Sequence, residues 1–273
     1  MLITVLVENT SISSDLGCEH GLSLFIKSDK YNILFDVGES ALSFQNAKKL
    51  NVNITDVDFL IISHGHYDHG GGLKVFLEEN AKANVYVHRL AFEKYYSARA
   101  NKSLDYIGLD QKLKTNKRII FTSDHFDIND NIQVFSNVVE KVPRPKSNKG
   151  LFVEHEGQIA NDTFAHEQNL VIEEDGKTLL LVGCAHKGIV NILEHFYSLK
   201  GITPNYVVGG FHLSSRSSGN EDPETIDEIA EYLMDTKAKF YTCHCTGLEP
   251  YRRLRSIMGD QIDYLSSGSE LTL

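Results

Sequence analysis

The sequence predicts an α/β protein built as a four-layer αββα sandwich, with two β-sheets face to face and helices on both outer faces. Three observations lead to this prediction. The chain opens with three strand-like runs, later runs alternate between helix and strand, and the second half repeats the order of the first. This order is typical of two sheets that share a core. No linker divides the chain, so we expect residues 1–273 to form a single domain.

The first half is expected to begin with three strands and to continue with alternating helices and strands. The apolar run Phe59–Ile62 suits a strand that is buried on both faces. The turn signal Asp36-Val37-Gly38 ends the third strand. The expected strands are residues 2–7, 22–27, 31–35, 59–62 and 85–87, and the expected helices are residues 41–50 and 73–81.

Residues 89–117 are mixed in character and rich in basic side chains, and we expect a helical insert with loops there. Strands are expected to resume at 119–121 and 132–135. Residues 142–150 contain Pro143 and Pro145 and are expected to form a surface loop.

The second half returns to alternating strands and helices. Asp222 and Pro223 form a strong helix start, with Asp at the N-cap and Pro at the first helical position. The expected strands are residues 170–174, 178–182, 205–208 and 240–242. One helix is expected to end near Leu199, a second to begin at Pro223 and a third to cover 249–258. A strand pair is expected to close the chain.

Composition limits the classes of function. An apolar share of 41% and a charged share of 23% are ordinary for a globular protein. The net charge of −10 argues against nucleic-acid binding, which needs an extended basic surface. Four cysteines and no signal peptide favour a cytoplasmic location, and no apolar stretch is long enough to span a membrane. The oligomeric state is left open.

One short run concentrates the metal-binding side chains. His64, His66, Asp68 and His69 lie together in the glycine-rich stretch that follows the strand at 59–62. Histidine is the commonest metal ligand, and aspartate supplies a hard oxygen. On an extended segment His64 and His66 would face one ion, and Asp68 and His69 are then free to hold a second. The run therefore predicts a metal site.

Three more histidines follow strand-like runs, where rigid scaffolds often present functional groups. They are His186, His212 and His244. A lone histidine is more often structural than functional, but together with the first run these three would complete two coordination spheres.

The run His64-x-His66-x-Asp68-His69 after a buried strand resembles the signature of the metallo-β-lactamase superfamily, and the resemblance covers essentially the whole chain. It implies the αββα fold of that superfamily and a two-metal site. His66 stands where flavodiiron members carry Glu, which favours a hydrolytic or transferase site over an oxygen-reducing one. Four further stretches resemble the subgroup named for dihydropterin ribofuranosyl-aminobenzene-phosphate synthase: Glu19-His20-Gly21-Leu22-Ser23, Gly183-Cys184-Ala185-His186-x-Gly188, Gly209-Gly210-Phe211-His212-Leu213 and His244-Cys245-Thr246-Gly247.

The resemblance implies a set of ligands. His64 and His66 would belong to the first metal, Asp68 and His69 to the second, and His244 matches the last metal histidine. Cys184 stands where the superfamily has a bridging aspartate. We favour His186 over His166 for the first metal. Cys184 is either a thiolate ligand or a small buried apolar residue.

Other polar residues are given supporting roles. His20, His212 and Arg216 are candidates for substrate contact, and His212 also for hydrogen bonding to developing charge. Asp68 is expected to be both ligand and catalytic residue. Cys243 and Cys245 flank His244 and are expected to pack in the core, because alternate residues of an extended segment face opposite ways.

These features suggest a dinuclear metal-dependent hydrolase that uses a metal-bound hydroxide on a small phosphorylated or ester substrate. Zinc is the favoured metal, with iron or manganese open. One alternative is a pterin-diphosphate-dependent transferase of the synthase type, with phosphates received by basic residues such as Arg89, Arg99, Lys146 and Arg216. Another is a non-catalytic metal-bound sensor or interaction protein.

Overall fold

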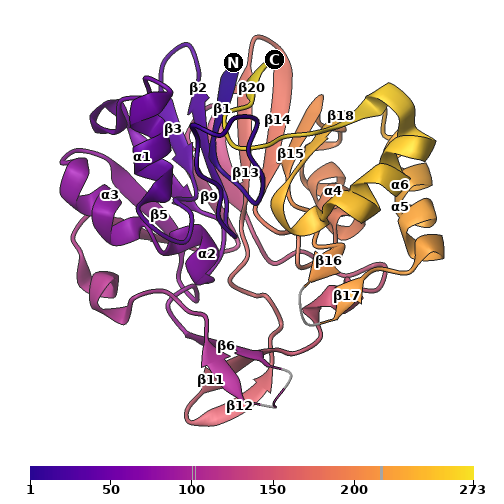
Figure 1. The fold of residues 1–273 in the computed structure, drawn as a ribbon, viewed down its shortest axis with the longest axis horizontal. Coiled ribbons are helices and arrows are strands. Elements are labelled where there is room, and N and C mark those ends of the chain that lie inside the picture. The colour runs from indigo at the N-terminus through magenta and orange to yellow at the C-terminus, as the bar shows by residue number, and fades with distance from the viewer. Residues whose placement is uncertain (100, 102, 216–217) are drawn as a thin grey trace.

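The computed structural model describes residues 1–273 except residues 100, 102, 216 and 217. Within the described residues, two seven-stranded sheets pack face to face, and helices cover the outer face of each (Figure 1). Helices α1 (Leu42–Lys49) and α3 (Leu73–Glu79) lie on one side, and α4 (Ile189–Lys200), α5 (Pro223–Asp235) and α6 (Leu248–Met258) lie on the other. The predicted four-layer α/β sandwich is confirmed.

The first sheet has the strand order β20-β1-β2-β3-β4-β5-β8. Its first three strands and β20 are antiparallel to their neighbours, whereas β3, β4, β5 and β8 run parallel. The parallel strands need crossover connections, which α1 and α3 provide. The bounds are β1 (Leu2–Val7), β2 (Ser23–Lys27), β3 (Asn32–Phe35), β4 (Phe59–Ile62), β5 (Asn84–His88), β8 (Ile119–Thr122) and β20 (Glu270–Thr272).

The second sheet has the order β19-β18-β15-β14-β13-β10-β9. Strands β14, β15, β18 and β19 are parallel, and α4, α5 and α6 make the connections between them. The bounds are β9 (His125–Asn129), β10 (Ile132–Phe135), β13 (Asn169–Glu174), β14 (Lys177–Val182), β15 (Tyr206–Gly209), β18 (Lys239–Thr242) and β19 (Ile262–Tyr264).

The core has three apolar clusters, one between the sheets and one under each helix layer. Side chains alternate along each strand, so a central strand contributes to two clusters. In β4, Ile61 faces the other sheet while Leu60 and Ile62 face α1 and α3. In β14, Leu181 faces the other sheet and Leu180 faces α4. This double burial explains the continuous apolar runs in the sequence.

The expected helical insert at 89–117 is wrong. The segment forms strands β6 (Lys94–Ala98) and β7 (Leu104–Tyr106), followed by a short 3-10 turn at Gln111–Thr115. With β11 (Leu151–His155) and β12 (Gln158–Asn161) they make a separate sheet of order β12-β11-β6-β7. The alternation in β6, where Tyr95 and Ser97 are buried between more exposed neighbours, is a strand pattern that its basic residues obscured.

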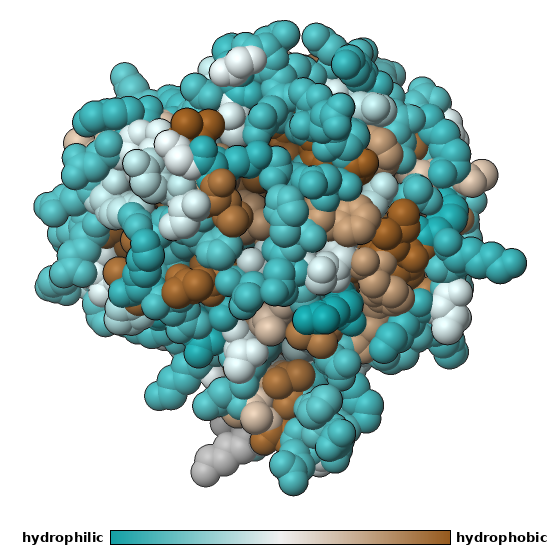
Figure 2. Space-filling view, turned by 180° about the vertical axis from the view of Figure 1, so that it is seen from behind, coloured by the Kyte–Doolittle hydropathy of each residue, from teal (hydrophilic) through white to brown (hydrophobic). Residues whose placement is uncertain are grey.

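The separate sheet forms the small lobe at the bottom of Figure 1. In Figure 2, hydrophilic side chains predominate on the visible face and hydrophobic ones form separate patches, one of them on this lobe. The exposed apolar residues of these strands are Leu104, Tyr106 and Ile159.

Two other details differ from expectation or add to it. The last two strands are not a pair, because β19 joins the second sheet and β20 joins the first, beside β1. Loop 142–150 contains a 3-10 turn, Lys146–Asn148, in which Ser147 is buried. Among the described residues, no helix combines the length and the apolar character that crossing a bilayer requires.

Candidate metal centre

The site lies where parallel strands of both sheets end. Asp36 follows β3, His64 follows β4, Cys184 follows β14, His212 follows β15 and His244 follows β18. Because parallel strands of one sheet end at a common edge, residues far apart in the sequence meet there.

The His64–Gly72 run has the local form that its spacing predicted. His66 is extended, with φ −96° and ψ 146°, so His64 and His66 lie on the same side, with ring centroids 4.6 Å apart. The short helix α2 (Tyr67–Gly70) then turns Asp68 and His69 toward a neighbouring position. A Cβ at Gly71 would lie 2.1 Å from the carbonyl oxygen of Glu39, so this turn has room only for glycine.

A first group of donors consists of His64, His66 and His186, whose ligand atoms all lie within 4.8 Å of one another. The Nε2 atoms of His64 and His186 are 3.3 Å apart. Nitrogens bound tetrahedrally at about 2.05 Å would be separated by about 3.3 Å. His66 Nε2 is buried and has no hydrogen-bond partner in the described part of the chain. The nearby Asp162 Oδ2 is 3.8 Å away, beyond hydrogen-bond distance, so this nitrogen and the spacing both fit a metal ion.

A second group consists of Asp68, His69 and His244. The Nε2 atoms of His69 and His244 are 3.2 Å apart, and Asp68 Oδ2 lies 3.8 Å from the former and 3.5 Å from the latter. These separations are also close to the edges of a small coordination polyhedron.

Cys184 lies between the two groups. Its Sγ is 3.1 Å from His69 Nε2 and within 4.8 Å of donor atoms of both His64 and His69. The thiol also forms clusters of the same size with His186 and His212. The structure thus places Cys184 Sγ beside donor atoms of both groups.

In four of these imidazole rings, Nδ1 points away from the centre and has an oxygen atom as its hydrogen-bond partner. Nε2 is therefore the nitrogen directed inward. Ser63 Oγ lies 2.8 Å from His64 Nδ1; the Nδ1 donors of His69, His186 and His244 reach Asp36 Oδ2 at 2.6 Å, Asn148 Oδ1 at 2.8 Å and Asn9 Oδ1 at 2.8 Å. Sequence reasoning missed all four oxygen partners; Asp36 was visible only as part of a turn signal.

The electrostatics of the site favour neutral imidazoles at His64 and His186, a charged carboxylate at Asp68 and a charged imidazole at His69. Burial, followed by the neighbouring imidazoles, holds the pKa of His64 and that of His186 well below the usual range. Burial alone would raise the pKa of Asp68, but the nearby histidines outweigh it and hold that pKa well below normal. Burial opposes the charge on His69 too, yet Asp36 and Asp68 raise its pKa to about 9. The carboxylates therefore favour positive charge at this position.

The three predicted substrate contacts fall in different places. His20 Nε2 lies 3.3 Å from Asp68 Oδ2, and its ring is 4.9 Å from that of His244. The ring of His212 is 4.1 Å from His186, and neither of its nitrogens has a hydrogen-bond partner among the described residues. Arg216 lies outside the described residues.

His166 is engaged elsewhere. Its Nδ1 accepts a 2.8 Å hydrogen bond from the backbone N–H of Gly65, and its Nε2 lies 3.0 Å from Asp162 Oδ2. Both nitrogens are therefore used to position the loop between His64 and His66, and His186 is the residue brought to the first group.

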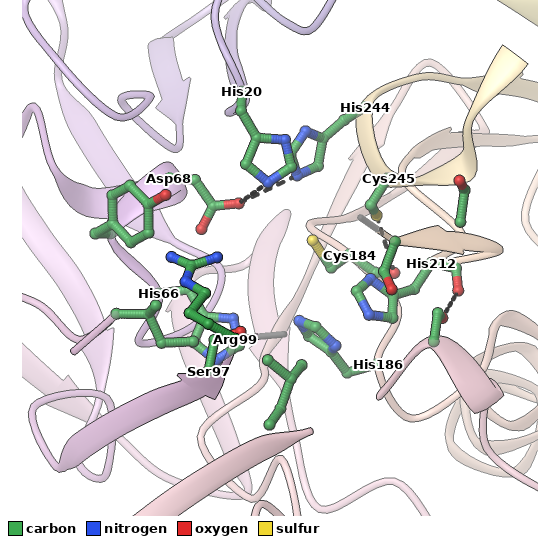
Figure 3. A pocket seen from close by; sticks show the side chains of 16 residues that line it. His20, His66, Asp68, Ser97, Arg99, Cys184, His186, His212, His244 and Cys245 are labelled. Carbon is green, nitrogen blue, oxygen red and sulfur yellow. Dashed lines mark hydrogen bonds and ion pairs between the residues drawn. The ribbon is translucent and has the colours of Figure 1, made fainter. Parts of the chain in front are cut away.

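The expectation for the two flanking cysteines holds for Cys243 only, which lies in the core between the sheets. Cys245 instead lines the same pocket as Cys184 and His244 (Figure 3). The reason is local: His244 has φ 52° and begins a 3-10 turn, His244–Thr246, so the alternation of an extended strand does not apply.

The pocket opens between the sandwich and the small lobe. Figure 3 shows His66, Asp68, Cys184, His186 and His244 around a shared space, with Ser97 and Arg99 of the lobe beside them. Of the basic residues proposed to receive phosphates, Arg99 lines this pocket, and Lys146 does not. Each has an acidic partner at 2.6 Å, Asp105 for Arg99 and Asp222 for Lys146.

Comparisons with known proteins bear on the family of the chain. Residues 16–222 match the family model described as the metallo-beta-lactamase superfamily. An uncharacterized protein of Methanocaldococcus jannaschii is 27% identical, with 94% of each chain covered. A 7,8-dihydropterin-6-methyl-4-(beta-D-ribofuranosyl)-aminobenzene-5'-phosphate synthase of the same organism is 27% identical over 98% of this chain and 94% of its own.

A solved structure adds a match across the whole chain. It is Tm1679, described as a metal-dependent hydrolase of the beta-lactamase superfamily; it is 29% identical, has a TM-score of 0.84 and covers 100% of this chain and 99% of its own. Family model, relatives and fold all point the same way, and the chain belongs to the metallo-beta-lactamase superfamily.

Proposed function

We propose that the protein is a dinuclear metal-dependent hydrolase that acts on a small phosphorylated or ester substrate. The observation that carries this proposal is the pair of adjacent donor groups that meet at Cys184 Sγ. The orphaned Nε2 of His66 and the donor spacings near 3.3 Å fit divalent ions.

Six side chains would hold the two ions, and Cys184 would stand between them. The first position would use His64, His66 and His186, and the second Asp68, His69 and His244. This mixture of imidazole, carboxylate and thiolate suits zinc. When bound, such ions supply Lewis acidity and a hydroxide nucleophile at neutral pH.

The protein's own residues would orient and protonate the substrate. Asp68 faces the pocket, and its Oδ2 lies close to His20, His69 and His244. These contacts fix the plane of the carboxylate and therefore the direction of Oδ1. His212 is buried with both nitrogens unpartnered within the described residues, and it is therefore available to donate a hydrogen bond to developing charge or to a leaving group.

The pocket wall supports an anionic substrate. The guanidinium of Arg99 donates from Nε to Asp105 Oδ2 at 2.6 Å, which anchors the side chain at the pocket mouth. Ser97 and Ser214 also line the pocket. Arginine with hydroxyl groups is a combination that recognises phosphate.

The test is hydrolysis of phosphomonoester, phosphodiester and thioester probes by the metal-loaded protein. We expect turnover that is abolished by EDTA, restored by zinc and lost in His66→Ala. The matched control is His155→Ala, because His155 is an exposed histidine of the lobe and lies outside the pocket lining. Turnover that survives both chelation and His66→Ala would refute the hydrolase, and bound metal without turnover of any probe would favour the sensor.

A second candidate is the transferase, and the 27% identical relative named as a synthase favours it. The same donor groups would hold a diphosphate leaving group. Release of diphosphate from a hydroxymethyl-dihydropterin diphosphate separates the two functions. Release that requires a ribofuranosyl-aminobenzene phosphate acceptor indicates transfer, whereas release without acceptor indicates hydrolysis.

A further inference from the structure

Two thiols face the centre rather than one. The ligand atoms of Cys184, His244 and Cys245 all lie within 4.8 Å of one another. Both cysteines are buried and line the pocket (Figure 3). Cys245 Sγ is 3.6 Å from the carbonyl oxygen of Cys184.

The backbone around Cys245 is shaped to bring its thiol to this place. The left-handed conformation of His244, with φ 52°, starts the 3-10 turn that directs Cys245 toward the pocket. On the facing strand end, a Cβ at Gly210 would lie 2.5 Å from Cys245 Sγ. Glycine at 210 therefore leaves space for a sulfur atom that a larger residue would fill.

The surroundings of Cys245 differ from those of a packing cysteine. Cys243, two residues earlier, is fully buried among aliphatic and aromatic side chains of the core. Cys245 instead shares its space with the His244 imidazole and the Cys184 thiol, both of which can ligate a metal. A sulfur atom beside such groups can act as a metal ligand as well as fill space in the packing.

We propose that Cys184 and Cys245 are both thiolate ligands on the His244 side of the centre, and that this pair restricts the protein to thiophilic metals. The inference rests on the proposed dinuclear function and deepens it. Soft thiolates favour zinc and related ions, whereas magnesium and manganese prefer oxygen donors. The protein should therefore take up zinc, cobalt(II) or iron(II) and reject manganese.

Cobalt(II) spectroscopy tests the proposal without relying on activity. Metal-free protein is loaded with cobalt(II), and the thiolate-to-cobalt charge-transfer absorption in the near ultraviolet is recorded. We expect a strong band in the parent protein, a loss of about half in Cys245→Ser because one of two sulfur ligands is removed, and no band in Cys184→Ser/Cys245→Ser. Cys243→Ser is the matched control, and we expect it to keep the full band.

The outcomes separate this inference from the proposed function. An unchanged band in Cys245→Ser overturns the role of Cys245 as a ligand. Two bound cobalt ions with no band in the parent protein overturn thiolate ligation by both cysteines but leave the dinuclear site in place. Failure to bind any ion overturns the proposed function itself. If Cys245→Ser does not fold by circular dichroism, X-ray absorption on the zinc-loaded parent decides, because sulfur scatters at about 2.3 Å from zinc. Because the measurement averages over two zinc ions, the pair on one ion gives about one sulfur per zinc, and a count of about half a sulfur per zinc would refute the pair.

Discussion

Asp36 offers the sharpest test of how the centre is held together, through the change Asp36→Asn. The carboxylate is fully buried. Its Oδ1 accepts from the Ser63 N–H at 2.7 Å, and its Oδ2 accepts from Ser63 Oγ at 2.7 Å and from His69 Nδ1 at 2.6 Å. Asp36 has φ 59°, a left-handed conformation that Asn adopts as readily as Asp, so the change alters charge and hydrogen bonding but not backbone strain.

The expected loss follows from the geometry. An amide NH2 in place of Oδ2 faces the His69 Nδ1–H, and in place of Oδ1 it faces the Ser63 N–H, so either orientation sets donor against donor. In the first orientation His69 loses the acceptor that holds its ring, and in the second the backbone N–H of Ser63, next to His64, loses its acceptor. Removing such a partner typically weakens metal affinity about 10- to 100-fold, or about 1.4–2.8 kcal/mol.

Zinc titration against a competing chromophoric chelator measures this loss in folded protein. The control is Asp58→Asn, because Asp58 lies at the opposite end of β4 and accepts from the Asn32 N–H and Lys82 Nζ, away from the centre. We expect Asp58→Asn to keep the parent affinity. Parent-like zinc affinity in folded Asp36→Asn would refute the reasoning that Asp36 orients His69.

Three further predictions concern pH, packing and metal removal. Burial lowers the pKa of His88 to about 4 from an unfolded value of 6.5; the unfolded chain therefore binds the extra proton, and stability present above pH 6.5 is lost as the pH falls to 4, by up to about 3 kcal/mol. Urea unfolding across that range should show that His88→Asn loses less unfolding free energy than the parent, whereas the exposed control His155→Asn loses as much as the parent. Equal slopes of unfolding free energy against pH in all three proteins would contradict this. Gly210→Ala should cost about 1–3 kcal/mol because its Cβ meets Cys245 Sγ; adding Cys245→Ala should recover much of that loss in the unfolding midpoint, and strict additivity would argue against the contact. EDTA should lower the thermal midpoint in differential scanning fluorimetry, because ions that bind only the folded chain add about 2.7 kcal/mol at a hundredfold excess over Kd; an unchanged midpoint would show that no ion stabilises the fold.

The sequence predicted the parts of the fold that depend on local pattern. The apolar run of β4 and the Asp-Pro start of α5 are patterns of adjacent residues, and the structure has both elements where they were expected. The segment at 89–117 was misjudged because its basic residues hide a period-two alternation. The hairpin of β11 and β12 turns at Glu156 and Gly157, both at positive φ, and Gly157 is the sequence signal for that turn.

The candidate site shows the same division between local and distant information. His64 and His66 were grouped from their spacing alone. The partner of His64 is its neighbour Ser63, whereas the acceptors that orient His69, His186 and His244 come from remote segments. Asn9 is 235 residues from His244. Single-sequence spacing carries no record of such pairings. Cys245 was misplaced for a different reason, since one left-handed residue, His244, cancels the alternation on which the prediction depended.

The pairing of the two ends of the chain has a consequence for biosynthesis. His244 is fixed by Asn9 and by Glu8, whose carboxylate accepts from the His244 N–H at 3.0 Å, and β20 pairs with β1 beside them. A nascent chain that has emerged through α4 already contains every donor of the first group, but not the last donor of the second. Closing a loop of this length is a late event in folding. Uptake of an ion by the second group would therefore have to wait until β18 and the strands that follow it have left the ribosome and paired.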